Sequence, residues 1–142
     1  MWSWRKIKST DTDFEFAKQI RNLVFVEEQG VSAGEEYDAF EYEAQHYLVF
    51  DSTNPIATAR WRETNNGIKL ERFAVLPTHR GKGVGQFLVE IVLKDVLPLN
   101  KSVYLNAQIQ VLDFYQKFDF VKEGELFEEA GIQHFKMCFK PA

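Results

Sequence analysis

The stretch "VLPTHRGKGVGQFLV" (Val75–Val89) decides the fold, because an apolar run leads into a glycine-rich loop and the loop leads into a helical pattern. Glycines occupy positions 81, 83 and 85, and Arg80 and Lys82 add positive charge. The first amides of a helix lack intrahelical acceptors and favour a phosphate, which glycines allow the backbone to approach closely. The loop therefore predicts a phosphate or pyrophosphate site. The alternative is a tight strand-to-helix turn without a ligand.

Two common phosphate loops do not fit this stretch. A nucleotide-triphosphate loop needs Ser or Thr directly after its lysine, and Gly83 follows Lys82 instead. The dinucleotide-binding pattern needs a third glycine where this chain has Gln86. A nucleoside triphosphatase and a dinucleotide-binding enzyme are therefore disfavoured.

Length and composition predict one globular domain over residues 1–142. The chain is 45% hydrophobic with 13 phenylalanines and 27% charged residues, which is enough apolar surface for a packed core. The net charge is −4 and no Lys/Arg run exceeds two residues, so no nucleic-acid partner is expected.

The chain carries few signs of a metal site, a disulfide or a membrane segment. Cys138 is the only cysteine, and His46 and His79 are scattered, so neither a disulfide nor a metal site is expected. No stretch approaches the roughly 18 apolar residues of a membrane helix, and the N-terminus lacks an apolar signal core. We expect no membrane contact and a cytoplasmic location.

Hydrophobic periodicity predicts a chain that contains both helices and strands, of the class α/β (α+β), with a mostly antiparallel sheet. A helix is expected from a cap at Thr10 or Asp11 to about Glu28, and an acidic surface loop or short helix over 30–43. A second helix should follow the glycine loop and stop at Pro98. A short third helix is expected over 111–118. The expected strands are 4–9, 45–51, 56–63, 68–75, 102–108, 120–123 and 134–140.

Two motifs at matching positions resemble the GNAT superfamily of N-acetyltransferases. Arg80, Gly83 and Gly85 fit its Gln/Arg-x-x-Gly-x-Gly/Ala pattern, and "FYQKFDF" (114–120) resembles its Phe-Tyr-x-x-x-Gly-Phe segment, with Asp119 in place of glycine. The segments "FVEEQGV", "LERFAV", "YLNAQ" and "EEAGIQH" look like the ElaA/YjcF-type subgroup. The resemblance implies a mixed, mostly antiparallel central sheet flanked by helices and splayed between the fourth and fifth strands.

The resemblance also implies acetyl-CoA as cosubstrate. Backbone amides of the loop would hold its pyrophosphate, and the strand before the loop would pair with the pantetheine arm. Gln108 stands where many members have asparagine, but it keeps a primary amide for the pantetheine. The implied cofactor-binding residues are Phe73, Ala74, Val75, Arg80, Gly81, Lys82, Gly83, Val84, Gly85, Asn106 and Gln108.

Two catalytic residues and an acceptor site follow from the same resemblance. Tyr115 would protonate the departing thiolate, and Glu71 would accept the amine proton through water. By residue type alone, Tyr115 could be a core aromatic, and Glu71 could form a cross-strand ion pair with Arg60 or Arg62. The implied acceptor-binding residues, for which a solvated helix end or a structural histidine is the alternative, are Glu27, Glu28, Gln29, Arg72 and His134.

Together these patterns predict an acetyl-CoA-dependent N-acetyltransferase that acts on a primary amine of a small molecule or peptide by direct attack, as a monomer or homodimer. The acidic segments suggest a cationic amine, although screened surface carboxylates are weak support for that. The competing prediction is a non-catalytic acyl-CoA-binding sensor or scaffold. That module would keep the glycine loop but would not need a phenol at position 115.

Overall fold

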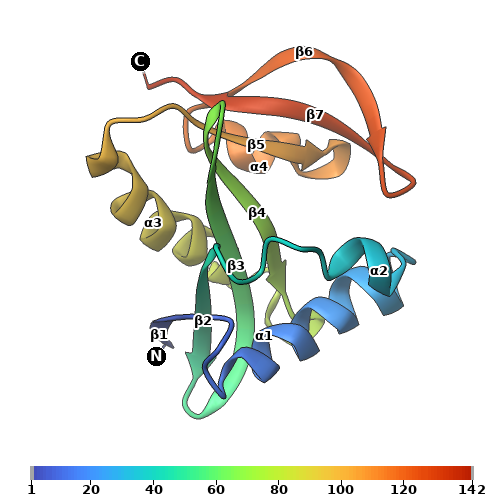
Figure 1. Cartoon of the computed structure of the whole chain (residues 1–142), viewed down its shortest axis with the longest axis vertical. Coiled ribbons are helices and arrows are strands. Elements are labelled where there is room, and N and C mark those ends of the chain that lie inside the picture. Colours follow the sequence, from blue (N-terminus) through green and yellow to red (C-terminus); the bar gives the residue numbers. More distant parts are fainter. Residues whose placement is uncertain (1, 142) are drawn as a thin grey trace.

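A meander of four antiparallel strands continues into a second, three-stranded group (Figure 1). The computed structural model describes residues 2–141. Within them the strands form one sheet in the order β1-β2-β3-β4-β5-β7-β6, and only the β4–β5 pair is parallel. The strands are β1 (Trp2–Ile7), β2 (Gln45–Asp51), β3 (Asn54–Thr64), β4 (Gly67–Val75), β5 (Val103–Gln108), β6 (Phe120–Glu129) and β7 (Ile132–Phe139).

Helices cover both faces of the sheet. On β2, Tyr47 and Val49 face a core with α3, whereas Leu48 and Phe50 face a second core with α1, because successive strand side chains alternate. Burial on both faces explains the continuous apolar run "YLVF". The α-helices are α1 (Phe14–Arg21), α2 (Ala33–Glu36), α3 (Val84–Val96) and α4 (Leu112–Gln116). Shorter helical segments are η1 (Asn22–Glu28), η2 (Pro77–His79), η3 (Leu97–Leu99) and η4 (Ile109–Val111).

The sheet opens between β4 and β5. These strands pair only from Ile68 with Val103 to Leu70 with Leu105. A register shift against β3 places an extra residue on β4 beyond Glu71, and Arg72 there has a φ of 58°. Such a bulge bends a strand and increases its twist. Residues 71–75 of β4 and 106–108 of β5 therefore border what we name the β4–β5 opening, as the splayed sheet predicts.

Several expected boundaries differ from the observed ones. The first helix begins at Phe14 rather than after Thr10 or Asp11, and it widens into the π-helical η1 from Asn22. β1 lies two residues earlier than expected, and β6 and β7 form a longer hairpin. The helix after the loop ends at Val96, and Pro98 lies inside the 3-10 segment η3. These ends depend on packing and on backbone hydrogen bonds that periodicity does not specify.

Candidate active site

The glycine loop presents consecutive unpaired amides. Gly81 and Gly83 have φ values of 75° and 89°, and Gly83 is the N-cap of α3. The amide of residue 87 donates to the Gly83 carbonyl, and within residues 2–141 the amides of residues 81–86 donate to no acceptor. Donors at a helix N-terminus are suited to a phosphate.

Arg80 and Glu28 bind each other. Both terminal nitrogens of Arg80 donate to the Glu28 carboxylate, at 2.9 and 2.6 Å, and Nε donates to the Val75 carbonyl at 2.9 Å. The hydrogen bond from Arg80, opposed by slight desolvation, lowers the pKa of Glu28. The structure thus joins a residue expected on the cofactor to one expected on the acceptor. In the part of the chain described, Lys82 forms no ion pair.

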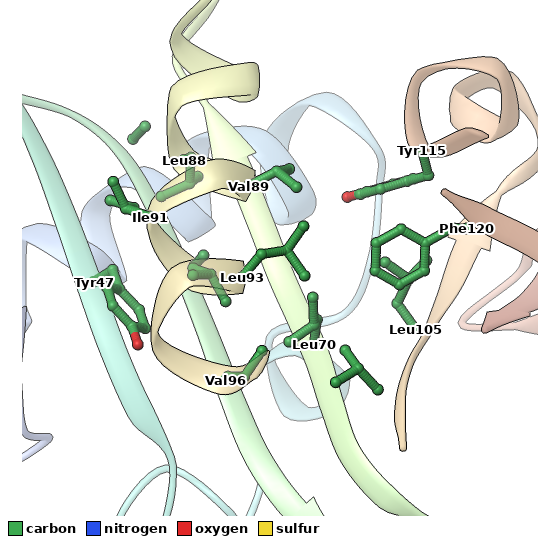
Figure 2. Close-up of a cluster of buried hydrophobic side chains, with 14 of the residues drawn as sticks. Tyr47, Leu70, Leu88, Val89, Ile91, Leu93, Val96, Leu105, Tyr115 and Phe120 are labelled. Atoms are coloured by element: carbon green, nitrogen blue, oxygen red, sulfur yellow. The ribbon is translucent and has the colours of Figure 1, made fainter. Parts of the chain in front are cut away.

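Tyr115 on α4 lies beside the β4–β5 opening. Its ring packs edge-on against Phe73 of β4 at 6.4 Å and against Phe120 at 6.0 Å. Figure 2 shows its hydroxyl directed from α4 towards α3 and β4. The side chain is buried, and burial raises the pKa of the phenol, which is therefore protonated at neutral pH. No hydrogen-bond partner of this hydroxyl lies within residues 2–141.

An amide chain crosses the end of the opening. Gln108 at the end of β5 donates to the side-chain oxygen of Gln29 at 2.9 Å, and Gln110 donates to Gln108. Gln29 is the C-cap residue of η1. Gln29, predicted for the acceptor site, is therefore hydrogen-bonded to Gln108, which was predicted for the cofactor site. Asn106 lies on the same strand and is half-buried.

Glu71 lies within an ion-pair cluster. Its carboxylate oxygens are 3.1 Å from Arg60, 2.8 Å from Arg62 and 3.1 Å from Lys69. Burial opposes ionisation, but these cations outweigh it and lower the pKa of Glu71. The ion-pair alternative is thus present in the structure. Its role as a base stays a prediction.

The acidic segment, predicted as a surface loop or short helix, contains the short helix α2, and three of its carboxylates are paired with buried arginines. Arg21, which is 1% exposed, binds Glu36 and Glu41, and Arg60, which is 0% exposed, binds Asp38 and Glu41. Of these residues, only Arg60 was named from the sequence, as a possible partner of Glu71. One signal was available: Arg21, the last residue of α1, lies at helical spacing between the buried Ala17 of α1 and Val24 of η1, and a buried charge needs a partner.

The remaining predicted acceptor residues lie apart from one another. Arg72 contacts Glu36 at 3.1 Å and Asp38 at 3.2 Å. Glu27 is exposed and accepts a hydrogen bond from Asn22. His134 stacks on Phe127, and its Nδ1 lies 2.7 Å from the Ile132 carbonyl.

Asp119, in place of the expected glycine, adopts a φ of 69°, so the turn before β6 is kept.

Comparison with known proteins identifies the family. Residues 18–140 match the family described as acetyltransferase (GNAT) domain. The chain belongs to the GNAT acetyltransferase family. The uncharacterized N-acetyltransferase YjcF of Bacillus subtilis is 38% identical over 133 residues, covering 92% of this chain and 95% of YjcF. Protein ElaA of Escherichia coli is 32% identical over 126 residues, covering 84% of this chain and 82% of ElaA.

Solved structures agree with the GNAT fold. The crystal structure of E. coli ElaA matches with a TM-score of 0.88 and 27% identity, over 99% of this chain and 100% of that one. An acyl-CoA N-acyltransferase from Pseudomonas aeruginosa also has a TM-score of 0.88, at 24% identity and the same coverage, and supports the fold alone. The expected family, subgroup resemblance and fold are confirmed. Membership implies an acyl-CoA cosubstrate.

None of the helices among residues 2–141 combines the length and apolar composition needed to cross a bilayer. In the same residues, His, Cys, Asp and Glu side chains form no group of three placed to hold a metal ion.

Proposed function

We propose that this GNAT protein, as a single domain over residues 1–142, transfers acetyl from acetyl-CoA to a primary amine of a small molecule or peptide by direct attack. The observation that carries the proposal is the β4–β5 opening. The amides of residues 81–86 are unpaired, β4 has no β5 partner beyond Leu70, and Phe73 in that part of β4 packs against Tyr115, which together support a phosphate site, a strand edge for the cofactor and a proton donor around one opening.

The cofactor would be held mainly by main chain. The amides after Arg80 bind phosphate oxygens, and the edge of β4 from Phe73 to Val75 pairs with the amides of the pantetheine arm, as in other strand additions. Asn106 and Gln108 offer polar groups from the opposite side of the opening. When bound, acetyl-CoA supplies an activated acyl group.

Proton transfer would be shared between two positions. Tyr115 is protonated at neutral pH, since burial raises the pKa of its phenol, and it would donate its hydroxyl proton to the sulfur as that atom gains negative charge, although the raised pKa makes the phenol a weaker acid. Glu71 stays ionised among its three cations and accepts the amine proton through water. Glu27, Glu28, Gln29, Arg72 and His134 would border the acceptor. Positioning of the amine against the acyl carbon supplies most of the acceleration.

Calorimetric titration with acetyl-CoA tests the cofactor site. Gly83→Asp places a carboxylate beside the unpaired amides, where an added Cβ would lie 3.8 Å from Trp2, so the side chain has room, although the positive φ strains the backbone of any residue with a Cβ. Gly124→Asp is the matched control, because this glycine also has positive φ and open space around it. We expect the wild type and the control to bind acetyl-CoA and Gly83→Asp to lose binding. Equal binding by all three would remove the loop from the site.

A screen of amines with detection of free thiol then tests turnover. Thiol release that depends on both acetyl-CoA and an amine supports the acetyltransferase. Binding of acetyl-CoA without turnover of any amine would favour the sensor or scaffold instead.

A further inference from the structure

The ion pairs beneath the β4–β5 opening form one connected cluster with more cations than carboxylates. Glu71 is shared by Arg60, Arg62 and Lys69, and Arg60 links it to the carboxylates paired with Arg21 and Arg72. The cluster has five cations, Arg21, Arg60, Arg62, Lys69 and Arg72, and four carboxylates, Glu36, Asp38, Glu41 and Glu71.

The excess charge lies at the β4 end of the cluster. Within the described residues Arg62 and Lys69 have Glu71 as their only ion-pair partner, and Glu71 is also held by the buried Arg60. One carboxylate thus serves three cations. By contrast, Arg21 and Arg72 each bind two carboxylates.

This end of the cluster is close to the place where an acceptor must enter. Lys69 and Leu70 are the last residues of β4 paired with β5 before the opening. Leu70 packs into the core with α3, so the alternating Lys69 and Glu71 lie on the opposite face of the sheet. The segment between α2 and β2 crosses that face in front of β3 and β4 (Figure 1), where Phe40 lies 3.8 Å from the Arg62 guanidinium.

The cations remain within reach of a small ligand. The side chains of Arg62, Lys69 and Arg72 are 15%, 16% and 23% exposed, so they are half-buried rather than sealed. A half-buried excess cation is poorly solvated and favours an additional anion. The carboxylates that suggested a cationic acceptor in the sequence are already bound to arginines. This face therefore favours an anionic group, whereas the acidic segments of the sequence suggest a cationic one.

We propose that the acceptor amine also carries an anionic group, a carboxylate or a phosphate ester, which binds Lys69 and Arg62. This inference rests on the proposed acetyltransferase function. At a rise of about 3.3 Å per strand residue, the Cα atoms of Lys69 and Arg72 are about 10 Å apart. The proposed site of the thioester is beside Tyr115, which packs against Phe73 in the unpaired part of β4, so several bonds must separate the anion from the amine.

Product analogues test the anionic subsite without turnover. The binding of N-acetyl ω-amino acids of two to six carbons, and of their uncharged primary amides, is measured by calorimetry on the full chain. We expect one chain length of the acids to bind at least about tenfold more tightly than its amide, and Lys69→Met to abolish that preference. Lys101→Met is the control, because Lys101 is an exposed lysine paired with Glu63 elsewhere. Equal binding of acids and amides would overturn the proposal.

Turnover separates this inference from the proposed function. Thiol release is compared for ω-amino acids, n-alkylamines of equal length, and 2-aminoethyl and 3-aminopropyl phosphate. Preference for the acids or for the phosphates supports the proposal and identifies which anion binds. Equal or faster reaction of the alkylamines overturns it but leaves the acetyltransferase intact. If no amine reacts and no N-acetyl compound binds, both the inference and the acetyltransferase fail.

Discussion

At the scale of single residues, Tyr115 decides between an enzyme and a binding module. Its side chain is buried beside the opening, and its hydroxyl, which keeps some contact with solvent, has no hydrogen-bond partner among residues 2–141. Tyr115→Phe keeps the aromatic packing against Phe73 and Phe120 but removes the proton donor. We expect turnover to fall about 100-fold with acetyl-CoA affinity nearly unchanged, measured by thiol release and calorimetry. Tyr42→Phe, at an exposed tyrosine, should change neither, and unchanged turnover of Tyr115→Phe would assign Tyr115 to the core alone.

Glu28 competes with the cofactor for Arg80. Both guanidinium nitrogens that could reach a phosphate are bonded to Glu28. Glu28→Gln removes the competing charge, so acetyl-CoA should bind a few-fold more tightly, and the gain should shrink in high salt because the pair is exposed. Calorimetry at two salt concentrations measures this. Weaker binding in the variant would mean that Glu28 instead positions Arg80 for the cofactor.

At the scale of elements, buried ion pairs hold α1 and the acidic segment against β3 and β4. Arg21→Met leaves Glu36 and Glu41 without one of their cations inside the fold. We expect unfolding by urea to show a loss of about 3–5 kcal/mol. Lys18→Met on the same helix removes only an exposed pair with Glu15 and should cost less than about 1 kcal/mol. Equal losses would show that the buried pairs add no net stability.

The same cluster predicts a pH dependence through Asp38. Partial burial opposes its ionisation, but hydrogen bonds and charge from Arg60 outweigh this and lower its pKa from 3.8 to about 2. A lowered pKa in the folded state contributes stability that is present above pH 3.8 and is lost as pH falls towards 2. The stability difference between wild type and Asp38→Asn should therefore be constant above about pH 5 and shrink below pH 4 in urea titrations. A difference independent of pH would contradict this assignment.

At the scale of the whole molecule, the opening divides β4 into a paired and an unpaired part. If acetyl-CoA binds there, hydrogen exchange should slow at amides of residues 81–86 and at the edge of 71–75, while residues 68–70, already paired with β5, should not change. Mass spectrometry with and without acetyl-CoA measures this. Protection confined to other segments would place the cofactor elsewhere.

The sequence by itself determined the order of strands and helices, the family and the position of the glycine loop. These depend on local signals, namely period-2 apolar runs from Gln45 to Val75, glycines at fixed spacing and the apolar face of α3. The splay between β4 and β5 followed from the family resemblance. Residues 45–51 were predicted with the observed bounds, and the turn residues "STNP" directly after Asp51 explain the end of that strand.

Only the tertiary structure decided which charged side chains meet. Glu28 and Arg80 are 52 residues apart in the chain, and Arg60 and Asp38 are 22 apart. The bulge at Arg72 and the shared carboxylate of Glu71 depend on the register between β3 and β4. The acidic segment reads as a solvated surface in the sequence because composition records charge but not partners. Pairing across folded elements reverses its meaning, since a carboxylate bound by a buried arginine no longer attracts a cation.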